Sequence, residues 1–251
     1  MSSVTRIRLD DAWHGRTTKA PHHLRFVCIS DTHGSVSAGG GELAVPDGDV
    51  LVHAGDFTTV GTLGEVQQFD DFLSTLPHPR KIVIAGNHDV TFDTPFYKQQ
   101  HDRFHFAFEQ GDPRELLRHC TYLQDSGTSV AGIKVWGSPW TPVFCDWAFN
   151  LPRGEQLRRK WDDIPDDTDI VITHGPAAGH GDLCDNGCRA GCRDLLERLQ
   201  HVKPKYLICG HIHEDYGVTH SGDTFYVNAS TCNLYYEPVN RPIVFDVPLP
   251  E

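Results

Sequence analysis

Short apolar runs that end in a glycine or a polar residue recur along this chain. Five of them are rich in valine and isoleucine: RFVCIS (25–30), DVLVHAG (49–55), KIVIAG (81–86), DIVITHG (169–175) and KYLICG (205–210). Runs of this length, without alternation of apolar and polar positions, are typical of strands that are buried on both faces. The pattern therefore predicts five buried strands.

Between these runs, apolar residues recur at spacings of three and four, which is the pattern of an amphipathic helix. Residues 63–76 (LGEVQQFDDFLSTL) carry one such face, and residues 192–200 (CRDLLERLQ) carry another just before KYLICG. A third helix is expected over 155–164, because Pro165 cannot continue it. Strands that alternate with helices indicate an α/β fold.

Two segments predict antiparallel strands in addition. Residues 215–230 hold two β-rich runs around Ser221-Gly222-Asp223, which is typical of a hairpin, and residues 128–137 show a similar pattern that turns near Gly132. No internal repeat or low-complexity linker interrupts the chain. We therefore expect a single domain over residues 25–251, preceded by an N-terminal arm or edge segment over 1–24.

Composition narrows the class of protein. The chain has 251 residues, of which 39% are hydrophobic, so it can bury a sizeable core. Its net charge of −12 argues against binding to long nucleic acid, whose phosphates are also negative. No apolar run reaches the roughly 18 residues that a bilayer span needs, and the N-terminus lacks the apolar region of a signal peptide. Eight cysteines in such a chain indicate reduced thiols. We expect a cytoplasmic protein without a membrane partner, and the sequence leaves its oligomeric state open.

The ends of the five runs carry the candidate chemistry. In α/β sheets, ligands bind beyond the carboxyl ends of the strands. Each run delivers oxygen or nitrogen donors to that edge: Asp31 with His33, Asp56, Asn87 with His88 and Asp89, His174, and His211 with His213. One aspartate at a strand end is usually a helix cap or a turn residue, and one histidine is usually only hydrogen-bonded. Five strand ends together are hard to attribute to chance.

The number and type of these donors indicate two metal ions. Mixed Asp, Asn and His ligands suit borderline metals such as Mn, Fe, Zn or Ni, and the set is larger than one ion needs. It fits two ions that share a bridging carboxylate. Two ions about 3.5–4 Å apart polarise a phosphoryl group and lower the pKa of a bridging water, so the expected chemistry is attack by a metal-held hydroxide on phosphorus.

Five short blocks resemble those of the calcineurin-like metallophosphoesterase superfamily in order and spacing: DTHG (31–34), GDF (55–57), GNHD (86–89), THG (173–175) and GHIH (210–213). The stretches GSPWTP (137–142), FNLPRG (149–154) and NASTC (228–232) further resemble the metallophosphoesterase-domain (MPPED) subfamily, which is related to class III cyclic nucleotide phosphodiesterases. The resemblance implies a four-layer α/β/β/α sandwich with mixed sheets. It also implies hydrolysis of small phosphodiesters, with cyclic nucleotides such as cAMP or cGMP as the expected substrates.

The resemblance assigns roles to the residues of the blocks. It implies that Asp31, His33 and His213 hold a first ion, that Asn87, His174 and His211 hold a second, and that Asp56 bridges the two. His88 would face the phosphate and protonate the leaving oxygen or stabilise charge, with Asp89 orienting it by a hydrogen bond. Some vertebrate relatives have glycine at the position of His211. This chain keeps the histidine, so a complete two-metal site is predicted, with manganese as the first candidate metal.

Several residues outside the blocks leave alternatives open. Cys184, Cys188 and Cys192 could form a zinc site with His180 or Asp182, although cysteines spaced in this way on a glycine-rich loop are a weak zinc signal. His180 and Arg189 of the same loop are candidate substrate contacts. Four aromatic residues could stack on a nucleobase or simply pack, namely Trp136, Trp140, Phe144 and Trp147.

Two other functions remain open. The chain could be a nucleotide-binding or scaffold protein with weak residual hydrolysis, an alternative that the retained His211 disfavours. It could also use the same site as a phosphomonoesterase or nuclease.

Overall fold

Two mixed β-sheets form the centre of the structure, a computed structural model that describes residues 3–15, 17–36, 43–104 and 110–250. The larger sheet contains, in spatial order, β1 (Thr5–Ile7), β12 (Gly217–Ser221), β13 (Thr224–Asn228), β11 (Tyr206–Cys209), β10 (Ile170–Thr173), β7 (Ile133–Ser138) and β6 (Ser126–Val130). The smaller sheet contains β14 (Ile243–Pro248), β2 (His23–Ile29), β3 (Val50–Ala54), β4 (Arg80–Ile84) and β5 (Thr121–Tyr122). A separate two-stranded ribbon pairs β8 (Thr141–Pro142) with β9 (Asn150–Leu151).

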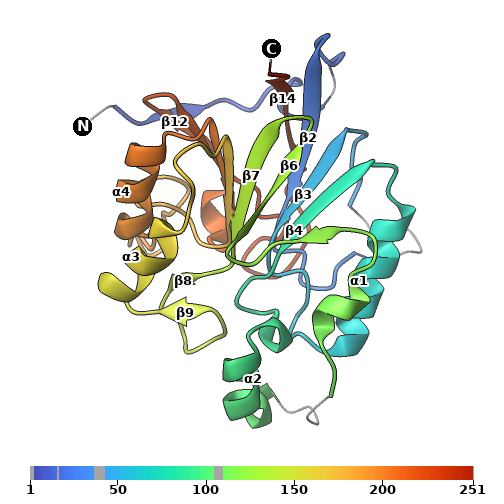
Figure 1. Ribbon diagram of the computed structural model, residues 1–251, viewed down its shortest axis with the longest axis vertical. Helices are drawn as coiled ribbons and strands as arrows, with labels where there is room; N and C mark the ends of the chain where they lie inside the picture. The colour runs from blue at the N-terminus through green and yellow to red at the C-terminus, as the bar shows by residue number, and fades with distance from the viewer. Residues whose placement is uncertain (1–2, 16, 37–42, 105–109, 251) are drawn as a thin grey trace.

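The helices lie outside the two sheets. The α-helices are α1 (Leu63–Thr75), α2 (Thr94–Gln100), α3 (Glu155–Asp162) and α4 (Arg193–Val202), and the short 3₁₀ turns are η1 (Val90–Phe92), η2 (His101–Phe104), η3 (Pro113–Leu116) and η4 (His213–Asp215). Figure 1 shows α3 and α4 on the side of the larger sheet and α1 on the side of the smaller one.

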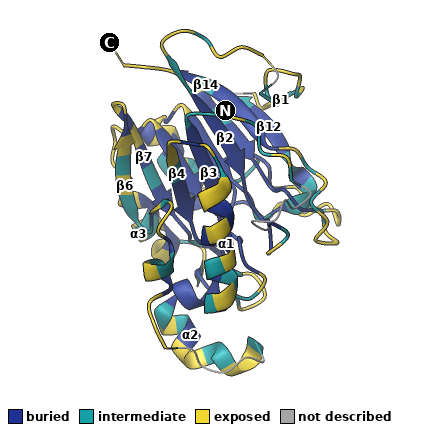
Figure 2. Cartoon of the chain, turned by 90° about the vertical axis from the view of Figure 1, so that its right-hand side faces the viewer, coloured by how far each residue is buried: buried dark blue, intermediate teal, exposed yellow. Residues whose placement is uncertain are grey.

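Three apolar clusters hold these layers together. The inner faces of both sheets share one core, in which Val52 and Ile84 of the smaller sheet join Ile172 and Ile208 of the larger. A second cluster packs α1 on the outer face of the smaller sheet, and a third packs α3 and α4 on the outer face of the larger. Figure 2 shows the same order, with buried strands inside and an exposed outer face on α1. The expected four-layer α/β/β/α sandwich with mixed sheets is confirmed.

The five apolar runs form strands as predicted, but they belong to two sheets rather than one. β2, β3 and β4 run parallel in the smaller sheet, and β10 and β11 run parallel in the larger. Their carboxyl ends nevertheless meet, because the sheets are bonded to each other there: a bridge joins Ser30 to Ser230, and the ring of His174 lies 3.0 Å from the carbonyl oxygen of Ala54. The edge expected from the sequence is therefore a seam between two sheets.

The predicted helices and hairpins are also present. α1 begins at a capping box, in which the Thr62 side chain accepts from the amide of Glu65 and the Glu65 carboxylate accepts from the amide of Thr62. β6 and β7 turn at Gly132, and β12 and β13 turn at residues 222–223. Within residues 1–24, β1 pairs with the edge of the larger sheet. In the described part of the chain, no helix has the length and apolar character needed to cross a bilayer.

Candidate metal centre

The seam between the sheets gathers every residue that the sequence predicted as a metal ligand. In a first cluster, donor atoms of Asp31, His33 and His213 all lie within 4.8 Å of one another. The Nε2 atom of His213 is 3.3 Å from Asp31 Oδ1 and 3.3 Å from His33 Nε2. Two imidazole nitrogens that face each other in this way cannot both carry a proton between them, whereas a cation satisfies both lone pairs. The cluster fits a divalent metal.

A second cluster lies beside the first, and a further group of donors, His33, Asp56 and His88, overlaps both. Donor atoms of Asp56, His174 and His211 lie within 4.8 Å of one another. Asn87 adds an amide oxygen 2.9 Å from His174 Nε2. Asp56 Oδ2 lies 3.2 Å from that same His174 nitrogen and 3.9 Å from His33 Nε2, so this carboxylate stands between the clusters. An ion in either cluster would lie within reach of this carboxylate, and the bridging role of Asp56 stays a prediction.

The backbone is strained where it presents these ligands. Asp31, His33, Asp56 and His211 all have positive φ, between 41° and 68°. Non-glycine residues in this region cost on the order of 1 kcal/mol or more each, and they persist where surrounding bonds fix them. Here the amide of Asp31 donates to the carbonyl of Gly55, and the amide of His33 donates to the carbonyl of Asp56. Strain concentrated on four ligands is typical of a functional site.

Two glycines let the strands approach closely enough to form the seam. A Cβ atom on Gly210 would lie 2.0 Å from Asp31 Oδ2, and one on Gly86 would lie 2.2 Å from Asp56 Oδ1. Neither position tolerates a side chain without moving a ligand carboxylate. The glycines of the GNHD and GHIH blocks are therefore required by space at the ligands themselves.

Hydrogen bonds with neighbouring protein groups orient the candidate ligands. Ser230 Oγ donates to Asp31 Oδ2 at 2.9 Å, and the amide of His211 donates to the same carboxylate at 3.0 Å. His213 Nδ1 lies 3.0 Å from the carbonyl oxygen of Asn233, and His174 Nδ1 contacts the carbonyl of Ala54 as described above. A carbonyl partner places a proton on Nδ1 in each histidine. Nε2 is then the atom left to bind a metal.

The positions of His88 and Asp89 correct one expectation. Asp89 does not orient His88, because its buried carboxylate accepts instead from the amides of Asp56, Gly86 and Thr58 and from the Thr58 hydroxyl. His88 Nδ1 lies 2.7 Å from the carbonyl oxygen of Thr59. Because the side chain of Asp89 is one methylene shorter than that of glutamate, its carboxylate stays close to the backbone and fixes the loop that carries Asp56. The orienting partner of His88 is a backbone carbonyl that no sequence motif reveals.

Charges within the seam set the pKa values of its members. Burial lowers the pKa of His174 and of His213, but the carboxylates of Asp56 and Asp31 outweigh burial and raise both values to about 9. Burial lowers the pKa of His33 to about 4 and that of His211 to about 3. Burial alone would raise the pKa values of Asp31 and Asp56, but the neighbouring histidines outweigh it and hold both values below their usual range. Without metal, two protonated histidines thus balance two carboxylates.

Burial, together with the charge of Asp56, raises the pKa of Asp89 to about 7.

The loop after β10 carries the two residues expected to contact substrate, His180 and Arg189, and each has a partner within the protein. The ring of His180 is 3% exposed, stacks on Tyr226 at 3.6 Å and bonds the Thr219 hydroxyl, so no face of it is left for a substrate. Arg189 instead forms an ion pair with the buried Asp182. The burial of His180 therefore argues against a substrate contact, whereas the role expected of Arg189, whose side chain is 54% exposed, stays a prediction.

The three cysteines of this loop do not converge on a zinc site. Cys192 is buried as the cap of α4, where its sulfur accepts from the Trp161 indole and the Leu195 amide. Cys188 is exposed. Among the described residues, the groups of His, Cys, Asp and Glu close enough to share an ion contain none of these cysteines.

The four aromatic residues singled out in the sequence divide into two pairs. Trp136 packs with the α3–α4 cluster, and Trp140 donates from Nε1 to Asp125. Trp147 stacks on His88 with ring centroids 4.0 Å apart, and Phe144 contacts the ring of His211. The second pair therefore lies at the metal centre. Sequence reasoning missed Ser230, Asn233 and Tyr236 there, because each is a single polar or aromatic residue in a loop without periodicity.

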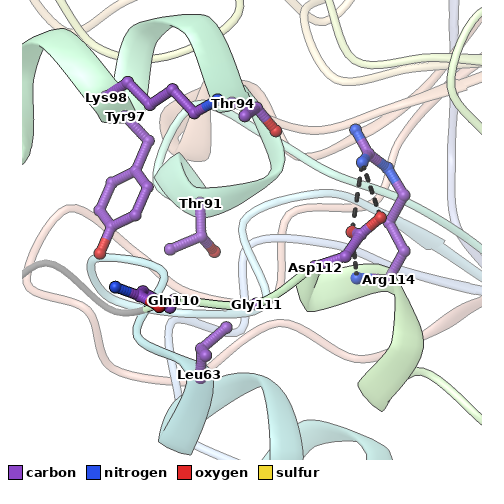
Figure 3. A pocket seen from close by; sticks show the side chains of 9 residues that line it. All are labelled: Leu63, Thr91, Thr94, Tyr97, Lys98, Gln110, Gly111, Asp112 and Arg114. Carbon is purple, nitrogen blue, oxygen red and sulfur yellow. Dashed lines mark hydrogen bonds and ion pairs between the residues drawn. The ribbon is translucent and has the colours of Figure 1, made fainter.

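A cavity of about 320 Å³ lies beside α2 (Figure 3). Thr91, Tyr97 and Lys98 line it, and Arg114 at its edge pairs with Asp112. None of the predicted site residues lines this cavity. The seam remains the place where the chemistry-bearing side chains meet.

Comparison with known proteins relates this seam to one family. The sequence profile of the calcineurin-like phosphoesterase family matches residues 24–215. Human metallophosphoesterase domain-containing protein 1 is 46% identical over 243 residues, which is 92% of this chain and 73% of that protein. A UPF0046 protein of Caenorhabditis elegans is 40% identical over 265 residues, which is 98% of this chain and 64% of that protein.

More distant relatives share part of the sequence or only the fold. The 3′,5′-cyclic adenosine monophosphate phosphodiesterase CpdA of Escherichia coli is 29% identical over 196 residues, which is 73% of this chain and 61% of that protein. The crystal structure of phosphopantetheinyl hydrolase from Mycobacterium tuberculosis aligns with a TM-score of 0.52 at 14% identity, over 89% of this chain and 96% of that chain. This last likeness shows a common fold.

Proposed function

We propose that this chain, which belongs to the calcineurin-like phosphoesterase family and is a phosphoesterase hydrolase, acts on small phosphodiesters with two divalent metal ions. The observation that carries the proposal is the pair of adjacent donor clusters with the Asp56 carboxylate between them. Members of the family use divalent ions, and both clusters can hold one. The count of two ions and the choice of a diester are the parts that we infer.

We assign the ligands by cluster. Asp31, His33 and His213 would hold the first ion. His174, His211 and Asn87 would hold the second, with Asp56 shared by both. Bound ions in these positions supply Lewis-acid polarisation of a phosphoryl oxygen and lower the pKa of a bound water. Manganese is the first candidate because mixed oxygen and imidazole donors suit it.

His88 is the residue that we assign to the proton of the leaving group. Its ring lies edge-on to the ring of His33 at 4.6 Å, next to the first cluster. The Thr59 carbonyl holds the Nδ1 proton, so Nε2 is the nitrogen that can carry the transferable one. In this assignment, Nε2 donates to the departing oxygen and then recovers a proton from solvent. Asn87 contributes a neutral oxygen, which adds no charge repulsion toward the phosphate.

Cyclic nucleotides are the substrates that we propose first. The support is the distant sequence likeness to CpdA, whose name identifies a cyclic adenosine monophosphate phosphodiesterase. The presence of His211 favours turnover over binding alone, because it completes the second donor cluster.

Hydrolysis of bis(p-nitrophenyl) phosphate by metal-depleted protein, before and after addition of Mn²⁺, tests the proposal. We expect Mn²⁺ to restore activity and His213→Ala to lower kcat/KM by at least about a hundredfold, since the first ion loses a ligand and even orienting contacts contribute roughly 10–100-fold. His201→Ala is the matched control, because this exposed histidine lies on α4 and pairs with Asp166 at the surface. Absence of metal-dependent hydrolysis, or full activity in His213→Ala, contradicts the proposal.

A further inference from the structure

Two half-exposed aromatic rings stand against the buried metal ligands. Phe144 is 52% exposed, and its ring meets that of His211 edge-on, with centroids 5.4 Å apart. Tyr236 is also 52% exposed, and its ring meets that of His33 edge-on at 4.7 Å. His211 belongs to one donor cluster and His33 to the other. Each cluster therefore has an exposed ring of its own.

Separate loops present the two rings. Phe144 follows β8 at the tip of the two-stranded ribbon, where its amide donates to the side chain of Asn150. The ribbon is closed behind it by a 3.1 Å bond from the amide of Val143 to the carbonyl of Leu151. Tyr236 lies between β13 and β14, on the chain that returns from the larger sheet to the smaller one. The rings thus approach the seam from different parts of the fold.

The turn that carries Tyr236 is fixed to the metal centre. The Asn233 side chain accepts from the amides of Tyr235 and Glu237, and the amide of Tyr236 donates to the Asn233 carbonyl at 3.0 Å. That same carbonyl is the partner of His213 Nδ1. A single residue therefore orients a metal ligand and holds the ring of Tyr236 in place. This ring position is built into the site.

Exposed aromatic rings beside a phosphate-binding centre indicate the chemical nature of the organic group attached to the phosphate. The ligand residues themselves are polar and mostly buried, so they can hold a phosphoryl group but offer little surface to an organic substituent. An aromatic ring offers a flat apolar surface, and stacking of a nucleobase on such a ring strengthens binding by about 5-fold to 150-fold. Stacking tolerates any base because every base has a π-face.

We propose that Phe144 and Tyr236 form an aromatic platform that binds the nucleobase of a nucleoside phosphodiester while its phosphate lies at the two donor clusters. The proposal rests on the proposed function and goes beyond it, because it names the residues that select the organic part of the substrate. It commits to nucleoside esters as a class and to stacking, rather than to recognition of one particular base.

Two substrates with the same leaving group isolate this contact. Thymidine 5′-(p-nitrophenyl) phosphate carries a nucleobase and methyl p-nitrophenyl phosphate does not, so the ratio of their kcat/KM values measures what the nucleoside adds. We expect the wild-type protein with Mn²⁺ to favour the thymidine ester by about 25-fold to 100-fold, because the base stacks on two rings. Phe144→Ala and Tyr236→Ala should each lower this ratio by about fivefold to tenfold, and the double variant should bring it close to one.

Matched variants distinguish the platform from general changes of the loops. Val143→Ala and Tyr235→Ala remove exposed side chains that neighbour the platform residues, at 54% and 82% exposure, and should leave the ratio unchanged. Tyr236→Phe keeps the ring and should keep the ratio. If an alanine variant does not fold, Phe144→Leu and Tyr236→Leu replace it, since leucine keeps bulk without a π-face.

Equilibrium binding separates failure of this inference from failure of the proposed function. Calorimetric titration of the metal-loaded protein with thymidine 5′-monophosphate and with methyl phosphate requires no turnover. Tighter binding of the nucleotide that is lost in the double variant supports the platform, even if neither ester is hydrolysed and the proposed function fails. An unchanged kcat/KM ratio in the double variant, or equal binding of both ligands by the wild type, overturns the inference.

Discussion

Replacement of Gly210 by alanine should place a methyl group inside the first metal cluster. The added Cβ would lie 2.0 Å from Asp31 Oδ2 and 2.1 Å from Ser30 Oγ, whereas real Cβ contacts essentially never fall below 3.0 Å. The missing 1.0 Å has to come from a shift of the Asp31 carboxylate, of the backbone at residue 210, or of both. Metal–ligand distances tolerate deviations of only about 0.2 Å. The substitution should therefore remove Asp31 from the coordination of the first ion.

The expected loss of metal affinity follows from the hydrogen bonds that the displaced Asp31 carboxylate would give up. Its carboxylate accepts from Ser230 Oγ and from the amide of His211, and hydrogen bonds to a charged group contribute about 1.5–3 kcal/mol each. Loss of one such bond corresponds to roughly 10–150-fold in affinity, in line with the 10–100-fold that orienting contacts contribute to metal sites. We expect Gly210→Ala to bind its first ion at least about a hundredfold more weakly, because the ligand itself is displaced.

Metal analysis after dialysis, combined with Mn²⁺ titration of activity, measures this effect. The wild type should retain two ions per chain and Gly210→Ala one, with activity recovered only at much higher Mn²⁺. Gly64→Ala is the control, because a Cβ at this position in α1 meets nothing within 4 Å. This control should bind metal normally and gain about 0.5–1 kcal/mol of stability. A folded Gly210→Ala variant with wild-type metal affinity would refute the steric reasoning.

Three further predictions concern different parts of the structure. Ser230→Ala removes the hydroxyl that orients Asp31 and should weaken Mn²⁺ binding about tenfold in calorimetric titrations, and unchanged affinity would show that this bond is dispensable. Metal must displace protons from His174 and His213, whose pKa values are near 9 without metal, so Mn²⁺ affinity should rise with pH by about tenfold per unit for each proton released and level off above about pH 9. Affinity that is flat between pH 6 and 9 would contradict those values. Thr62→Ala breaks the capping box of α1 and should lower the free energy of unfolding by about 1 kcal/mol in urea titrations, with no change in metal content, and an unshifted midpoint would contradict the cap.

The strands and the meeting of the candidate ligands at one place could be predicted because both depend on local pattern. The runs that lead to Asp31, Asp56 and His211 are continuous and apolar, as strands buried on both faces require, and each places its candidate ligand two residues after the last strand residue. The residue type at a strand end therefore specified the chemistry. The division of these strands between two sheets was implied by the family resemblance and not by the pattern, because periodicity does not encode which strands pair.

The supporting contacts could not be predicted, because they join residues far apart in the chain through backbone groups. The partner of His88 is the carbonyl of Thr59, and the partner of His213 is the carbonyl of Asn233. A backbone carbonyl is present at every residue and leaves no mark in the sequence. The role first given to Asp89 was wrong for this reason, since its true partners are backbone amides held near it by the fold.

Anomalous diffraction from crystals of the Mn²⁺-loaded protein tests the two-metal centre most directly. We predict two peaks about 3.5–4 Å apart, one bound by Asp31, His33 and His213 and the other by Asn87, His174 and His211, with an Asp56 oxygen contacting both. A single peak at saturating Mn²⁺, or ions bound away from this seam, would contradict the account.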